Sequence, residues 1–96
     1  MVVIPNPTDF KFVKFERSTS KGKKYDALLY NKKANKYKRV PFGDVDYPHY
    51  EDKTGLGDYT HLNTYSKERR RLYRIRHQGE DKKKFSSGYF SLRFLW

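Results

Sequence analysis

The sequence predicts one small α+β domain: an N-terminal antiparallel sheet of about three strands, a long acidic loop, an arginine-rich helix and a short aromatic C-terminal element. A chain of 96 residues has room for a single modest core. Its first part alternates aromatic and basic residues as strands do, and a later segment has a serine cap and helical spacing. We expect an extended N-terminal arm over 1–9, the sheet over 10–42, the loop over 43–65, the helix over 66–78 and the C-terminal element over 79–96.

Three stretches have the composition of strands. They are "FKFVKF" (10–15), "YDALLY" (25–30) and "YKRVPF" (37–42), all rich in aromatic and β-branched residues. The second and third flank "NKKANK", in which Asn31 and Asn35 tolerate the turn conformations of a hairpin. Pro41 cannot donate to a ladder, so the third strand is expected to lie at an edge or to end there.

The arginine-rich helix is predicted from its ends. Ser66 suits the N-cap, Glu68 lies in the first turn where the helix dipole favours an acid, and Gly79 suits the stop. Leu72 and Ile75 share one face, which predicts a narrow buried stripe on a helix that otherwise faces outward.

The C-terminal element has two interpretations. Phe90, Leu92, Phe94 and Trp96 alternate as in a strand, whereas Ser87 as an N-cap favours a short helix. We favour the helix. An apolar terminus is expected to dock on its own core or on a neighbour, and nine Tyr, seven Phe and one Trp predict a core built largely from rings.

The charge is large and unevenly placed. The chain has 22 basic and 11 acidic residues, a net charge of +11, and the acidic segment 40–65 separates two basic blocks. Such a potential attracts nucleic acid or acidic protein surfaces. The chain has no cysteine, no apolar run near the ~20 residues that span a bilayer, and no secretory signal at its start, so we expect an intracellular protein without disulfides.

The basic residues offer two candidate binding sets, one on the helix and one in the lysine loops. Arginine forks bind phosphates in bidentate fashion and Tyr73 could stack on a base. The alternatives are a solvated helix face, arginines that cover rings, and lysines that protect sheet edges. The candidates for contact with nucleic acid or an acidic partner are Arg69, Arg70, Arg71, Arg74, Arg76, Lys21, Lys23, Lys24, Lys32 and Lys33.

Catalytic and metal motifs are weak. His49, His61 and His77 stand at no recognised ligand spacing, so no metal site is expected. His61 and Asn63 with Asp58 would form only a degenerate nuclease site. There is no phosphate-binding glycine loop and no nucleophile elbow. We therefore expect no enzyme, no cofactor and no small-molecule substrate.

The order of the motifs resembles a family of short basic proteins of unknown function from large double-stranded DNA viruses and some tailed phages. The resemblance covers about residues 25–96 and consists of an F-G after a strand, D-Y-T-x-H, R-x-x-Y-x-x-R-H on a helix, and a close on "LW". The matching positions are Phe42, Gly43, Asp58, Tyr59, Thr60, His61, Arg70, Tyr73, Arg76, His77, Gly88, Leu95 and Trp96.

The resemblance implies a viral protein that is carried in the particle. Our leading expectation is a non-enzymatic minor capsid or cement-type protein of the virion, present in the host cell interior during assembly, whose partners are larger viral structural proteins. The alternative is a protein that organises the viral genome through the arginine helix and lysine loops, with DNA favoured over RNA. The expected aromatic docking residues are Phe90, Phe94, Trp96 and Tyr73, and a structural polar network is expected of Asp58, His61 and His77 with the helix.

Overall fold

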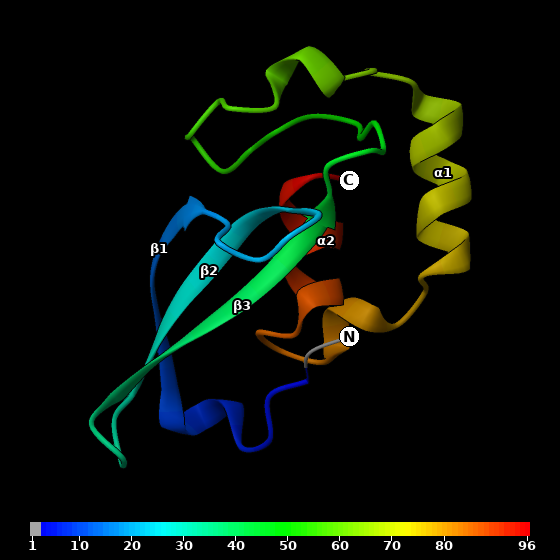
Figure 1. Cartoon of the computed structure of the whole chain (residues 1–96). Coiled ribbons are helices and arrows are strands. Elements are labelled where there is room, and N and C mark those ends of the chain that lie inside the picture. Colours follow the sequence, from blue (N-terminus) through cyan, green and yellow to red (C-terminus); the bar gives the residue numbers. More distant parts are fainter. Residues whose placement is uncertain (1–2) are drawn as a thin grey trace.

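The predicted strands form one antiparallel sheet. The structure, a computed structural model, describes residues 3–96. β1 (Phe10–Arg17), β2 (Lys23–Asn31) and β3 (Lys36–Asp44) are hydrogen-bonded in that order (Figure 1), which confirms the α+β class with an N-terminal sheet. β3 lies at an edge, as Pro41 indicated, but it does not end there. Pro41 pairs with Asp26 and the strand continues to Asp44.

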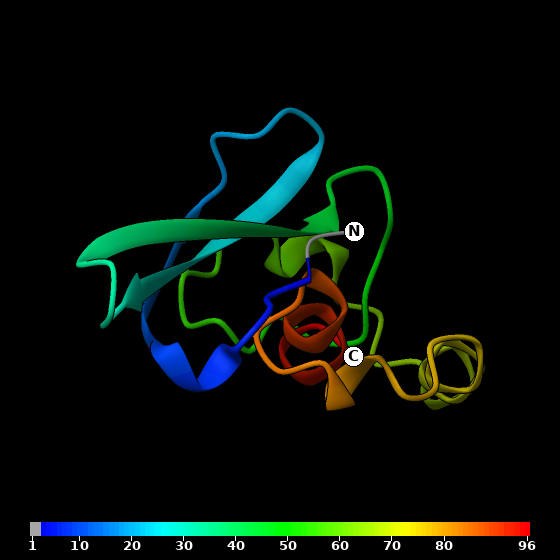
Figure 2. The same cartoon turned by 90° about the horizontal axis from the view of Figure 1, so that it is seen from below.

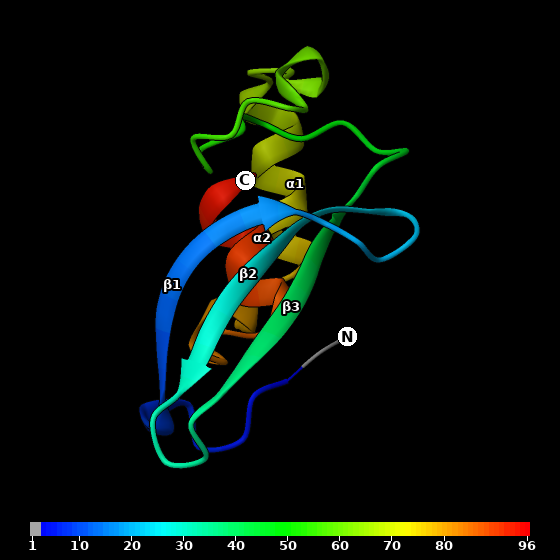
Figure 3. The ribbon, with the colours of Figure 1, turned by 60° about the vertical axis from the view of Figure 1, so that its left-hand side comes forward.

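The inner face of the sheet carries the core. Because side chains alternate along a strand, every second residue of β2 and β3 points to this face. The helix α2 (Ser87–Phe94) covers it (Figure 3), and the ring of Phe90 lies 5.6 Å from that of Phe42. The sheet residues buried beneath α2 are Tyr25, Ala27, Leu29, Val40 and Phe42.

The C-terminal element is the predicted helix, with a different cap. Ser86, not Ser87, is the N-cap: its backbone is extended and its Oγ accepts a hydrogen bond from the Tyr89 N–H at 3.1 Å. The cap therefore lies one residue earlier than the sequence indicated, and Ser87 is the first helical residue.

The N-terminal segment is not an extended arm over residues 3–9, and residues 1–2 of that prediction lie outside the described residues. Pro7–Asp9 form a 3₁₀ helix, η1, directly before β1. Ile4 is only 4% exposed and belongs to the core. Burial of an isoleucine side chain explains why the segment folds back.

The acidic segment between β3 and the next helix is ordered by backbone hydrogen bonds. His49 and Asn63 form an isolated bridge, and the His49 N–H donates to Leu62 O at 3.1 Å. The N–H groups of Tyr50 and Glu51 both donate to Leu95 O, at 3.0 and 3.1 Å. The segment, which includes the 3₁₀ helix η2 (Thr60–Leu62), is thus tied to the end of α2.

The arginine-rich helix, α1 (Lys67–Arg76), stands to one side of the sheet and of α2 (Figure 2). Ser66 is its N-cap, as predicted, and it ends before His77; the short 3₁₀ helix η3 (Glu80–Lys82) follows. The predicted buried stripe is wrong. Leu72 and Ile75 are 45% and 57% exposed, because α1 turns a different face to the body of the protein.

Candidate functional site

The face of α1 that contacts the body centres on Tyr73. Its ring stacks on the indole of Trp96, with centroids 4.3 Å apart and planes at 7°, and on the imidazole of His77 at 4.1 Å. Its hydroxyl hydrogen-bonds with Ser91 Oγ of α2 at 3.0 Å, and burial raises its pKa above the ordinary value. Tyr73 is therefore engaged within the chain and does not present a free ring to a base.

Two of the five candidate arginines help to hold α1 in place. Arg70 Nε and an Arg74 guanidinium nitrogen donate to the main-chain oxygen of Trp96, at 2.9 and 3.1 Å. The Arg70 guanidinium also lies over the ring of Tyr50, 4.6 Å from its centroid. These contacts give both arginines a structural role, which the sequence offered only as an alternative.

The other three arginines are exposed. Within residues 3–96 no acid forms an ion pair with Arg69, Arg71 or Arg76. Residues three and four apart are neighbours on a helix, so Leu72 lies beside Ile75, with Arg71 and Arg76 flanking them. We call these four exposed residues the outward face of α1, although two of them, Leu72 and Arg76, also line the groove between α1 and the body that is described below. It is an apolar pair between two free cations.

Lys24 does not belong to a polyanion site. Lys21 and Lys23 are exposed, but Lys24 is 2% exposed. Its Nζ donates to Tyr47 O at 2.6 Å and lies 2.9 Å from His49 Nδ1. Alternation along β2 points Lys24 away from the inner face, and the segment after β3 covers it there. Desolvation lowers its pKa to about 8.

Lys24 is part of a buried polar cluster that the sequence analysis missed. His49 Nε2 lies 2.6 Å from Asn63 Oδ1, which also accepts from the Asp52 N–H at 2.8 Å, while the Tyr25 hydroxyl donates to Asp52. If His49 Nε2 carries the proton, Nδ1 is free to accept from Lys24. The cluster joins β2 to the acidic segment.

Burial shifts the pKa values of the cluster. Desolvation, with the nearby Lys24 charge, lowers the pKa of His49. Burial and the hydrogen bond to Asp52 raise the pKa of Tyr25. For Asp52, burial acts to raise the pKa, but hydrogen bonds from Thr54 and Tyr25 outweigh it and the net shift is downward. The one sequence signal for this cluster is the position of Lys24, directly before the predicted strand 25–30 that begins with Tyr25.

The expected polar network of Asp58, His61 and His77 is not present. Asp58 is exposed and makes no hydrogen bond or ion pair with the rest of residues 3–96. His61 is exposed and its ring lies 6.0 Å from that of Tyr59. His77 stacks on Tyr73, and its Nδ1 lies 3.0 Å from a Glu80 carboxylate oxygen. The three residues thus serve separate parts of the chain.

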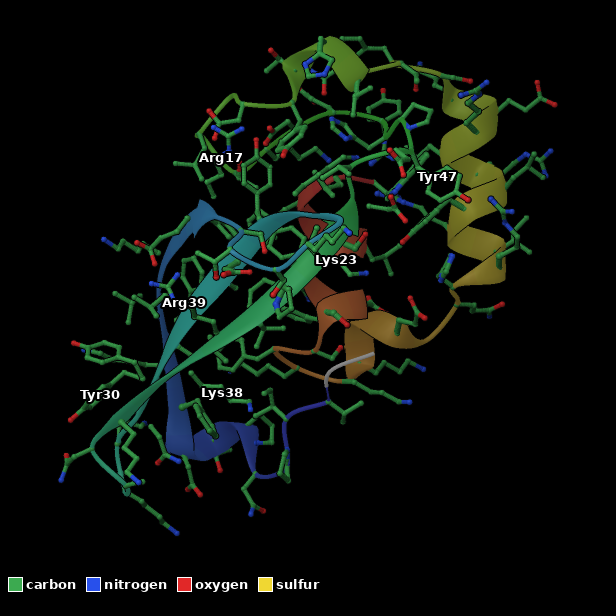
Figure 4. The ribbon with its side chains drawn as sticks, in the orientation of Figure 1. Arg17, Lys23, Tyr30, Lys38, Arg39 and Tyr47 are labelled. Atoms are coloured by element: carbon green, nitrogen blue, oxygen red, sulfur yellow. The ribbon has the colours of Figure 1, made fainter. Side chains whose placement is uncertain are left out.

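The lysines of the β2–β3 hairpin form a second basic region, away from α1. Lys32 and Lys33 lie in the turn, and Figure 4 shows Tyr30 and Lys38 toward the same end of the hairpin. Lys33 is 3.5 Å from Asp9, an exposed pair of the kind that contributes little. The structure therefore divides the candidate cations between two ends of the molecule.

A groove separates α1 from the body. Its volume is about 740 Å³, and it contains Lys23 on one wall with Arg69 and Arg76 on the other. Tyr47, 65% exposed, and Trp96 also line it. Lys23 and the buried Lys24 both line this groove, and of the two only Lys23 is exposed beside the arginines of α1.

The aromatic C-terminal residues dock on their own chain. Phe90 is 2% exposed and lies in the core, so it cannot anchor a partner, and that part of the prediction is corrected. The ring of Phe94 packs on Phe15 at 4.7 Å, and Trp96 stacks on Tyr73. Their role is to close the core and to hold α1.

The described residues contain no group of three or more His, Cys, Asp or Glu placed to hold a metal ion. Among the same residues no helix combines the length and apolar character that crossing a membrane requires. Comparisons of the chain with family models, curated proteins and solved structures return no match.

Proposed function

We propose that the chain is a non-enzymatic structural protein of a virus particle, a minor capsid or cement-type component that binds larger capsid subunits. The viral assignment rests on the motif resemblance, and the geometry supports an assembly role through the outward face of α1. On this proposal the protein acts in the host cell interior during assembly and then resides in the virion.

The outward face of α1 is the observation that carries the assembly role. Apolar side chains with arginine are typical anchors of protein interfaces. Leu72 and Ile75 remain about half exposed, although the chain has few aliphatic residues to place in its core. Covering both would contribute about 2 kcal/mol of binding free energy, counting about half of a full side-chain burial for each. Arg71 and Arg76 make an acidic rim on the partner the best match.

The test is incorporation into particles. Leu72→Asp/Ile75→Asp, introduced in the virus that encodes the chain, should strongly reduce the amount of this protein in purified particles. Leu56→Asp, at a loop position that is 41% exposed, is the matched control and should incorporate normally. Circular dichroism of each purified variant checks that the fold is intact. Absence of the wild-type chain from particles, or equal incorporation of the double variant, would contradict the proposal.

A second candidate is genome organisation through α1 and the lysine loops. It is favoured by the absence of acidic partners for Arg69, Arg71 and Arg76 among residues 3–96. Binding to duplex DNA should then show a salt slope of about −0.9 per phosphate contact. Arg71→Glu/Arg76→Glu should flatten that slope. These positions are preferable to Arg70 and Arg74, whose removal would also release Trp96.

A further inference from the structure

On the sheet face opposite α2, the half nearest the β2–β3 turn is exposed to solvent. In the register of the sheet, Lys11 pairs with Tyr30 and Tyr30 with Tyr37, which makes one row across all three strands. The next row runs from β1 through Leu28 to β3. Paired residues point to the same side, and this side is opposite to that of the buried Leu29. We define the open face as Lys11, Lys14, Leu28, Tyr30, Tyr37 and Arg39.

Two tyrosine rings form the centre of the open face. The rings of Tyr30 and Tyr37 lie 5.1 Å apart at 59°. Tyr37 is 66% exposed, more than any other large hydrophobic side chain among the described residues. The Tyr30 hydroxyl donates to Asn35 Oδ1 at 2.8 Å, and Asn35 is held in the turn at φ 53°. One ring is thus fixed and its neighbour presents a surface to solvent.

Free cations surround the rings at the hairpin end. Lys11 and Lys32 are exposed and form no ion pair with any residue of the described chain. On this side of the sheet Glu16 lies 2.6 Å from Arg39, and beside the turn Asp9 lies 3.5 Å from Lys33, so neither acid pairs with Lys11 or Lys32. Lys11 and Lys32 therefore remain available as cations at the end of the sheet that carries the tyrosine pair.

We propose that the open face binds single-stranded nucleic acid, with bases stacked on Tyr37 and Tyr30 and phosphates on Lys11 and the turn lysines. Exposed rings beside cations on a sheet are the combination that single-strand binders use, because every base offers a face and every phosphate a charge. A row across three strands is about 10 Å wide, and Lys11, Tyr37 and Arg39 on the open face are exposed. A duplex would offer phosphates but would keep its bases stacked away from the rings.

This site is separate from the outward face of α1, on which the proposed function rests. Figure 4 shows Tyr30 and Arg39 on strands that lie away from α1. An acidic protein would use the lysines but not the ring pair. Loss of binding on removal of one ring, with all charges unchanged, therefore distinguishes the nucleic acid from an acidic protein.

The experiment is fluorescence anisotropy with labelled oligo(dT) and oligo(U) of 12 nucleotides, and with a DNA duplex of equal phosphate number. Both single strands should bind, and the duplex should bind less tightly. Tyr37→Ala should weaken single-strand binding about tenfold, whereas Tyr37→Phe should retain it because the ring remains. Tyr47→Ala, which removes an equally exposed ring outside the sheet, should have no effect.

Two variants of equal charge change locate the phosphates. Lys11→Glu/Lys32→Glu should lower the salt slope by about 1.4, since each single-strand contact contributes about 0.7. Arg71→Glu/Arg76→Glu changes the net charge by the same amount on α1 and should leave that slope in place. Wild-type affinity in Tyr37→Ala, equal binding of the duplex, or loss of the slope only in the α1 variant would overturn the proposal. Particle incorporation tests the assembly role independently of all three results.

Discussion

Replacing Trp96 by Ala should release α1 without unfolding the sheet. α1 is joined to the body by the Tyr73–Trp96 stack, the Tyr73 hydroxyl and the two arginine contacts with Trp96 O. The substitution removes the stack but keeps the main-chain oxygen. A ten-residue helix is shorter than the ~12–15 residues that isolated helices need to be even marginally stable, so α1 should lose its order when it loses the stack.

The size of the effect follows from the burial of the indole. Replacing a fully buried Trp by Ala lowers the free energy of unfolding by about 3–5 kcal/mol. A stacked ring pair contributes about 0.5–1.5 kcal/mol beyond the area that it buries. Trp96 is only partly buried, so about 2 kcal/mol is expected. That free energy is roughly a thirtyfold change in the opening equilibrium of α1.

Amide hydrogen exchange measures that opening directly. In Trp96→Ala, protection of the α1 amides should fall about thirtyfold while amides of β2 change much less. Trp96→Phe should recover part of the protection because a ring remains. Leu72→Ala, on the outward face of the same helix, should leave it unchanged. An equal loss of protection in β2, or none in α1, would refute the idea that Trp96 holds α1 against the body.

Three further predictions concern the buried polar cluster and the end of β3 beside it. Desolvation lowers the pKa of Lys24 to about 8, so protonation of its amine opposes folding. The free energy of unfolding should therefore rise from pH 7.5 to 9.5. Lys24→Met should abolish that rise, as measured by urea titrations. The pKa of His49 is also lowered, so stability should fall as pH drops below about 6.5, and His49→Gln should remove this component of the pH profile. Gly43→Ala should lower the free energy of unfolding by about 1–3 kcal/mol more than Gly22→Ala does. Both glycines have positive φ, but only a Cβ at Gly43 would meet Leu95, at 2.8 Å. Equal losses in chemical denaturation would show that backbone strain alone matters.

Most of the fold could be predicted from short stretches of the sequence. Strand composition, the Asn-containing turn and the Ser66 cap identified the sheet and the start of α1, because these signals act within a few residues. The face that α1 buries was not readable, because helical spacing cannot tell which of two faces meets a partner element. Leu72 and Ile75 looked like a core stripe, yet it is Tyr73, partly buried, that packs on the body, since Trp96, 23 positions later in the sequence, provides a ring to stack on.

The buried polar cluster was hidden for a similar reason. Lys24 resembles the other lysines of its loop, and only the long-range placement of His49 and Asn63 shows that its amine is buried. The composition gives the net charge of +11, but the sequence could not separate arginines that hold Trp96 from those that face solvent.

The two basic regions of the surface lie far apart, and this separation has a functional consequence. α1 and the hairpin end of the sheet lie on opposite sides of a molecule that is 41 Å along its longest axis (Figures 1 and 2). At physiological salt the screening length is about 8 Å, so occupancy of one region should hardly alter the potential at the other. A capsid subunit on the outward face of α1 and a nucleic-acid strand on the open face are therefore compatible on one copy. If both proposals hold, Leu72→Asp/Ile75→Asp and Tyr37→Ala should each remove one interaction and leave the other intact, which a single shared surface would not allow.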